Sequence, residues 1–131
     1  MRSLLTLALA LLAGCGGAST QATPASLAGH WVQVSLAGQP LPRFAFYFCA
    51  NTCFTGATLT SATIDVDAAN GYAMVQNYAT QPSPDRDLGT LRPVGDSLIF
   101  DSGLFGPIKG RIANDTLHEY YKGFDYAFVR K

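Results

Sequence analysis

The chain has 131 residues, and its nine basic and nine acidic side chains give a formal net charge of zero. This length is typical of a single domain. The balanced charge argues against nucleic-acid binding, which needs a basic patch, and against electrostatic attachment to a membrane surface.

The start of the chain has the three-part layout of a secretory signal. Arg2 gives a positive start, an apolar run extends from Leu4 to Leu12, and two small residues precede Cys15. The apolar run is too short to span a bilayer, which takes roughly 20 residues. The pattern predicts a signal peptide over residues 1–14.

The four residues Leu12-Ala13-Gly14-Cys15 resemble the bacterial lipobox. The resemblance implies that Cys15 receives a diacylglycerol thioether, that the chain is cut before it and that its new amine is acylated, with palmitate among the lipids. Two or more acyl chains anchor a protein stably. Gly16 stands where Asp is the usual inner-membrane retention signal, so the resemblance implies attachment to the outer membrane, on its periplasmic side. The alternatives are a plain signal peptide with an unmodified cysteine and a buried apolar helix.

Residues 15–26 are expected to form a lipidated, flexible tether, because Gly, Ala, Ser and Thr dominate the segment after the cysteine. A flexible segment of this length spans roughly 17–20 Å. That reach is enough to hold a small domain clear of the lipid headgroups. Residues 27–131 are then expected to form the folded domain.

Apolar residues recur with a period of two from Gly29 onward, and turn residues interrupt the pattern often. In His30–Leu36 the alternation places Val32, Val34 and Leu36 on one face. Further strands are expected over Phe44–Cys49, Thr58–Val66, Tyr72–Thr80, Leu88–Pro93, Ser97–Asp101, Pro107–Ala113, Thr116–Tyr121 and Phe124–Arg130. Asn70-Gly71 is a strong hairpin signal, and Gln81–Asp87 is expected to be an exposed loop.

Eight or nine short strands without a convincing helix predict an all-β domain. A sandwich and a barrel both fit this spacing. Closure into a single small antiparallel β-barrel of about eight strands in meander order is favoured, because it leaves no long strand edges exposed. A barrel of this size encloses side chains or one small ligand.

Two cysteines remain after Cys15, and both would lie in an oxidising compartment. Cys49 and Cys53 are three residues apart across Asn51-Thr52, a plausible turn. A disulfide is the favoured interpretation. Two unpaired thiols are the alternative, if strand geometry keeps them apart.

The triplet Gly29-His30-Trp31 resembles the G-x-W motif that opens lipocalin-like barrels. The resemblance implies that Trp31 closes one end of the barrel and that a basic residue of the last strand, Arg130, stacks on its ring. Leu27–Trp31 together with Gly38–Leu41 is also similar to the opening of META/HslJ-type envelope lipoproteins. Neither resemblance implies a particular ligand.

Catalytic patterns are missing from the sequence, so no enzyme activity, metal site or cofactor is expected. His118 and Glu119 are adjacent on a strand and would point to opposite faces. Asp65 and Asp67 share a face and could hold a cation, but they precede a hairpin turn, where solvated aspartates are common. Asp101-Ser102 has neither the G-x-S-x-G context nor a positioned histidine.

Aromatic residues make up 11% of the chain and suggest a pocket. Most are expected to pack the core. The functional interpretation is that some line a pocket for a small apolar or amphipathic ligand. The candidates are Trp31, Tyr72, Tyr78 and Tyr120. The leading hypothesis is therefore a non-catalytic binding module. The alternative is a protein-interaction module that docks on an envelope protein, or inhibits a hydrolase, through the Gln81–Asp87 or Cys49–Cys53 loop.

Overall fold

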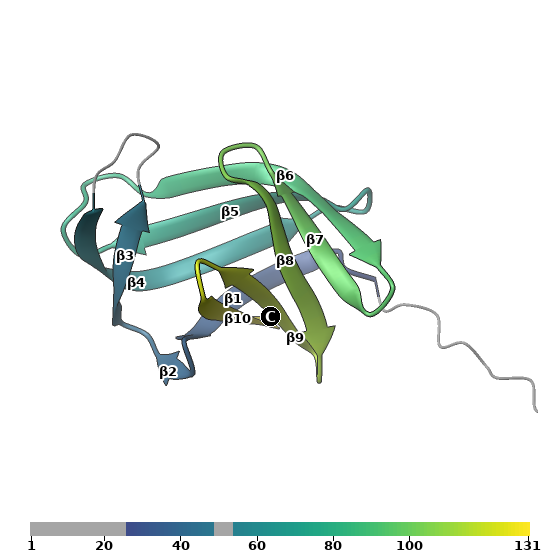
Figure 1. Cartoon of the computed structure of the whole chain (residues 1–131), viewed down its shortest axis with the longest axis horizontal. Coiled ribbons are helices and arrows are strands. Elements are labelled where there is room, and N and C mark those ends of the chain that lie inside the picture. The colour runs from purple at the N-terminus through teal and green to yellow at the C-terminus, as the bar shows by residue number, and fades with distance from the viewer. Residues whose placement is uncertain (1–25, 49–53) are drawn as a thin grey trace, which may run out of the picture.

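The structure, a computed structural model, describes residues 26–48 and 54–131, with side chains placed for 26–44 and 57–131. The described residues form ten strands (Figure 1). These are β1 (Gly29–Leu36), β2 (Gln39–Pro40), β3 (Arg43–Phe48), β4 (Phe54–Val66), β5 (Gly71–Tyr78), β6 (Asp85–Val94), β7 (Ser97–Ser102), β8 (Gly106–Ala113), β9 (Thr116–Tyr121) and β10 (Phe124–Arg130). Within these ranges there is no helix with the length and apolar character to cross a membrane.

Eight of the strands close into an antiparallel barrel, as the sequence predicts. The order around the barrel is β1-β10-β9-β8-β7-β6-β5-β4, and β4 pairs back onto β1. One edge of β1 pairs with β10. On the other edge, the first half of β1 pairs with β4, and Ser35 and Leu36 pair with β2. The first part of β4 pairs with β3 in the same way. The short strands β2 and β3 therefore extend the sheet where β1 and β4 part.

The strands β7 to β10 agree with the prediction to within one residue at each end. Two strands begin earlier than predicted: β4 begins at Phe54 rather than at Thr58, and β6 begins at Asp85 rather than at Leu88. The expectation of an exposed loop over the whole of Gln81–Asp87 is therefore wrong. Two aspartates and an arginine made the segment look solvated, but Asp87 is buried and its carboxylate is hydrogen-bonded by buried side chains.

The prediction that Val32, Val34 and Leu36 share one face of β1 is also wrong. Trp31 and Gln33 are buried, whereas Val34 is 42% exposed. A register shift between Gln33 and Ser35, opposite β10, then returns Leu36 to the interior. An inserted residue of this kind moves the alternation by one position, so a strict period of two assigns the wrong face.

The barrel has two ends, and successive hairpin turns of the meander lie at them alternately. The turns after β4, β6 and β8 share one end with Trp31 and the last residues of β10. We call this the tryptophan end. The turns after β5, β7 and β9 share the other, the carboxylate end, named for Asp87 and Glu119.

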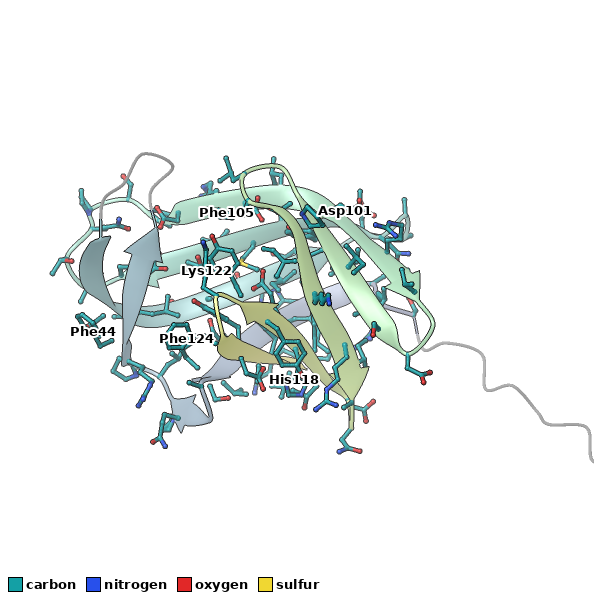
Figure 2. The ribbon with its side chains drawn as sticks, in the orientation of Figure 1. Phe44, Asp101, Phe105, His118, Lys122 and Phe124 are labelled. Atoms are coloured by element: carbon teal, nitrogen blue, oxygen red, sulfur yellow. The ribbon has the colours of Figure 1, made fainter. Side chains whose placement is uncertain are left out.

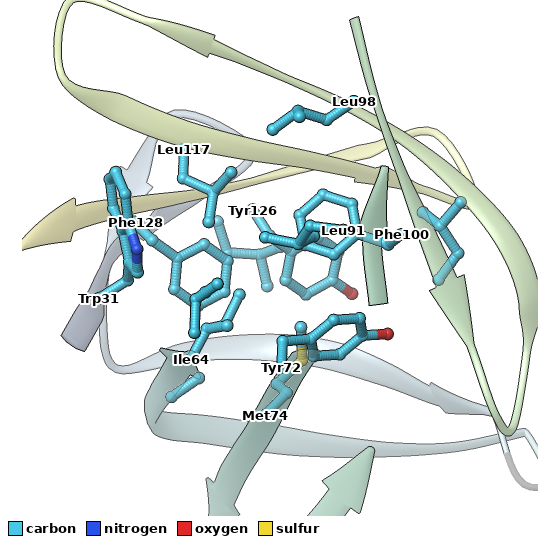
Figure 3. Packing of buried hydrophobic residues seen from close by; sticks show 14 of the residues in the cluster. Trp31, Ile64, Tyr72, Met74, Leu91, Leu98, Phe100, Leu117, Tyr126 and Phe128 are labelled. Carbon is cyan, nitrogen blue, oxygen red and sulfur yellow. The ribbon is translucent and has the colours of Figure 1, made fainter. Parts of the chain in front are cut away.

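The core between the two ends is built from large side chains (Figure 3). Trp31, Phe128 and Ile64 are almost completely buried next to the tryptophan end. Phe100 and Tyr72 meet edge to face, with ring centroids 5.7 Å apart. Gly89 pairs with Tyr72 across β5 and β6, and a Cβ there would lie only 2.7 Å from Tyr72 Cε1. A glycine is therefore required where this ring lies across the neighbouring strand.

Candidate functional site

The tryptophan end is sealed by Trp31 and Arg130. Trp31 is 1% exposed, and its Nε1–H donates to the carbonyl of Leu27 at 3.0 Å. The Arg130 guanidinium carbon lies 4.5 Å from the centre of the indole ring, which confirms the expected stacking. Arg130 also donates hydrogen bonds to the carbonyls of Ala28, at 2.7 Å, and Ser26.

Gly29 makes this arrangement possible. Its φ is +143°, and a Cβ at this position would lie 3.4 Å from Arg130 Nη1. The first residue of the G-x-W motif thus accommodates both an unusual backbone conformation and the close approach of an arginine side chain. Trp31 serves as a plug for this end and is packed on all sides.

The carboxylate end contains a fixed aspartate. Asp87 is 6% exposed and accepts hydrogen bonds from the Tyr72 hydroxyl, at 2.8 Å, and from Ser102 Oγ, at 2.9 Å. The Ser102 oxygen in turn accepts the backbone N–H groups of Leu104 and Phe105, at 3.1 and 3.0 Å. Asp87 is therefore held by donors from β5 and β7 and is tied to the turn between β7 and β8.

A second buried carboxyl, that of Glu119, has a different hydrogen-bonding environment from that of Asp87. Glu119 is 4% exposed and faces the interior from β9, opposite Tyr126 of β10. Among the described residues none donates a hydrogen bond to its side chain. Burial, and secondarily the charge of Asp87, raise the pKa of Glu119 to about 8. The carboxyl is therefore mostly protonated at neutral pH.

Three tyrosines lie within electrostatic reach of Glu119. Burial and then the hydrogen bond to Asp87 raise the pKa of Tyr72 far above its usual range, with a smaller contribution from Glu119. Burial followed by the charge of Glu119 raises the pKa of Tyr126 to about 12 and also raises that of Tyr121. All three remain neutral hydroxyls at physiological pH. The hydroxyls of Tyr72 and Tyr126 point away from Trp31 (Figure 3).

A second acceptor in the interior comes from β1. Gln33 is 5% exposed, and its strand position opposite Phe128 turns the side chain inward. Its Nε2 donates to the carbonyl of Ser35 at 3.0 Å. Its Oε1 is buried and has no hydrogen-bond partner among the described residues. Buried polar groups usually have a partner, so the Glu119 carboxyl and the Gln33 amide oxygen both have unused hydrogen-bonding capacity.

Aromatic side chains border the carboxylate end at the turns after β7 and β9. The rings of Phe105 and Tyr121 have centroids 5.4 Å apart, and the Lys122 ammonium lies 5.9 Å from the Tyr121 ring centre. Phe124 lies close to the same turn, packed against the core (Figure 2). We call Phe105, Tyr121 and Phe124 the aromatic rim. This end therefore combines an aromatic border with two buried acidic side chains.

The predicted pocket residues are only partly brought together. Tyr72 and Tyr78 are both buried on the inward face of β5, at 4% and 9% exposure. The prediction that Tyr120 joins them is wrong. Tyr120 is 37% exposed on the outer face of β9, where it stacks on His118 with centroids 6.1 Å apart.

The residues that sequence reasoning missed are Glu119, Asp87 and Gln33. The pattern of β9 contained the signal for Glu119, because it shares a period-two face with Leu117 and Tyr121. Asp87 was missed because its charged neighbours made the segment look exposed. Gln33 was missed because the bulge in β1 breaks the alternation.

The remaining polar pairs lie on the outer surface. His30 Nδ1 is 2.6 Å from Asp65, and His118 Nδ1 is 2.9 Å from Asp125. Asp67 accepts two backbone N–H groups of the turn after β4. The described residues contain no cluster of three or more His, Cys, Asp and Glu side chains that could hold a metal ion.

The lipidation and disulfide predictions fall on Cys15, Cys49 and Cys53, which lie outside the described residues. No family model, curated protein or solved structure matches the chain. The barrel is therefore established by the structure, and membership of a lipocalin-like or META/HslJ-type family stays a prediction from short motifs.

Proposed function

We propose that this chain is a lipid-anchored protein of the cell envelope that binds a small amphipathic molecule at the carboxylate end, without catalysis. The observation that carries the proposal is the buried carboxyl of Glu119 on β9, the strand that ends at Tyr121 of the aromatic rim, together with the unpartnered Oε1 of Gln33 in the barrel interior. An amphipathic ligand satisfies both features, since its polar group reaches the interior acceptors and its apolar part lies against the rim.

The position of residue 26 supports a role for the lipid anchor in orientation. Arg130 holds the Ser26 and Ala28 carbonyls at the tryptophan end. A lipid on Cys15, in the outer membrane on its periplasmic side, attaches through the tether to that end. The carboxylate end then faces away from the bilayer, where soluble molecules reach it.

The anchor and the binding site are tested separately. Replacing Cys15 by Ser is expected to release the protein from the membrane fraction and to abolish palmitate labelling; retention of both contradicts the anchor. For the ligand, the full chain with Cys15→Ser is screened by thermal shift against single-chain amphiphiles. We expect a saturable increase in Tm that Tyr121→Ala weakens and Tyr120→Ala, on the outer face, leaves unchanged.

A second candidate function is docking on an envelope protein, such as an assembly factor or a hydrolase. It is favoured by two exposed leucines beside the rim, Leu88 and Leu104, at 65% and 66% exposure. They are neighbours because Gly103 N–H donates to the Leu88 carbonyl at 2.9 Å. Leu104→Ser is expected to abolish capture of such a partner while leaving amphiphile binding intact. The opposite result supports the first function.

A further inference from the structure

We infer that the polar group of the ligand is a primary ammonium, and that the carboxyl of Glu119 receives it. This inference rests on the proposed ligand-binding function and specifies the chemistry of its ligand. Within the described parts of the chain, no lysine or arginine forms an ion pair with Glu119 or Asp87. Neither carboxyl in the interior of the carboxylate end thus has a partner cation among the side chains that the structure describes.

The acceptors of the site indicate which kind of donor a ligand has to bring. Asp87 already accepts hydrogen bonds from Tyr72 and Ser102. The Gln33 Oε1 has no donor among the described residues, and only burial and the charge of Asp87 act on the Glu119 carboxyl, with no hydrogen bond. A primary ammonium brings three N–H donors and a positive charge. A hydroxyl brings one donor and no charge, and a quaternary ammonium brings charge without a donor. A carboxylate ligand brings no donor and is repelled by the charge of Asp87.

The groups that face Glu119 from neighbouring strands favour a cation. They are Tyr72 of β5, Asp87 of β6 and Tyr126 of β10, together with Tyr121 of β9 itself. On β8 the residue opposite is Gly110, which has no side chain to compete for the carboxyl. The tyrosines are neutral, so the charge of Asp87 dominates. Lys122, in the turn after β9, lies with its ammonium 5.9 Å from the centre of the Tyr121 ring.

Binding then has a defined proton balance. The free protein holds Glu119 mostly as the neutral acid at pH 7, because its pKa is raised to about 8. The ammonium stabilises the carboxylate, so complex formation releases the Glu119 proton to solvent while the ligand keeps its own three. Linkage makes affinity rise by up to about tenfold per pH unit between pH 5.5 and 7.5.

The test compares four ligands with the same eight-carbon chain on the full chain carrying Cys15→Ser. The ligands are octylamine, octanol, octanoate and octyltrimethylammonium, measured by isothermal titration calorimetry below their micelle concentrations. We expect octylamine to bind at least about tenfold more tightly than octanol. Glu119→Gln should remove most of that preference, and Gln33→Leu part of it. Asp96→Asn, which makes the same carboxyl-to-amide replacement on the exposed turn between β6 and β7, should leave it intact.

The possible outcomes separate the inference from the function on which it rests. Equal binding of octylamine and octanol, or tightest binding of octanoate, overturns the ammonium inference but leaves ligand binding standing. Equal binding of the primary and quaternary amines overturns the role of N–H donors. If none of the four binds at any pH, the proposed function fails as well. Circular dichroism and urea unfolding of each variant show whether a lost preference merely reflects a lost fold.

Discussion

The two ends of this barrel use the same architecture for opposite purposes. At the tryptophan end, Trp31, Phe128 and Ile64 exclude water, and Arg130 closes the surface over them. At the carboxylate end, Asp87 and Glu119 lie inside the barrel at similarly low exposure. One end gains stability from apolar burial, and the other holds ionisable groups that burial destabilises.

The difference teaches where to look for function in a small barrel. Packing accounts for the tryptophan end, since its polar atoms are paired with backbone carbonyls. Packing does not account for Glu119, because a leucine at that position would bury more apolar area without the desolvation cost. A residue that opposes folding and lies beside a partly exposed aromatic rim is better explained by binding.

The largest effect should come from removing the plug. Trp31→Ala deletes a side chain that is 1% exposed and should lower the free energy of unfolding by about 3–5 kcal/mol. Urea denaturation followed by circular dichroism measures this loss. Tyr120→Ala, an aromatic truncation on the outer face of β9, is the matched control and should cost about 1 kcal/mol or less. Similar losses at the two positions would contradict the contrast between a sealed end and an exposed surface.

A pH-dependent loss of stability should mark the carboxylate end. The raised pKa of Glu119, about 8, means that the folded state binds this proton more tightly than the unfolded chain, where glutamate titrates near pH 4.3. Stability from this group is therefore fully present below about pH 4.3 and is lost as the pH rises to about 8. The slope is at most about 1.4 kcal/mol per pH unit.

The variant Glu119→Gln isolates that contribution. It keeps the size of the side chain but cannot ionise, so its free energy of unfolding should change much less than that of the parent between pH 5 and pH 8. The two proteins should differ most at pH 8 to 9, where the parent carries a buried charge. Parallel pH profiles for the two proteins would show that Glu119 is solvated in the folded state.

The barrel was predictable because its signals are local. Alternating residues and turn residues such as Asn70-Gly71 and Asn114-Asp115 fix each strand independently, and Asn70, Asn114 and Asp115 adopt the positive φ angles that such turns require. The G-x-W motif and a basic residue in the last strand were enough to anticipate the stacking of Arg130 on Trp31. These features depend on neighbours in sequence or on a single motif.

The site was not predictable because it depends on register between distant strands. Asp87 looks solvated in the sequence Pro-Asp-Arg-Asp, and only its pairing opposite Met74 places it inside. Gln33 faces inward in alternation with Trp31, but the bulge that follows it puts Leu36 out of phase with both, so alternation counted from Leu36 places Gln33 on the wrong face. Tyr120 was chosen as an aromatic residue, although the phase of β9 gives the inward positions to Glu119 and Tyr121. Choosing by aromatic character therefore favoured Tyr120 over its inward-facing neighbour Glu119.

The smallest expected effect concerns the cover of the tryptophan end. Arg130→Lys keeps the positive charge but loses the planar group that stacks 4.5 Å from the indole and donates to two carbonyls. An ammonium cannot make the same set of contacts from one position, so we expect a loss of about 1 kcal/mol by urea unfolding. Arg92→Lys is the matched control, because its exposed pair with Asp101 contributes little.

Octylamine affinity should not change in either variant, since Arg130 acts at the end of the barrel opposite to Glu119. A change in affinity with Arg130→Lys would instead mean that the two ends are coupled through the shared core of Phe128 and Ile64.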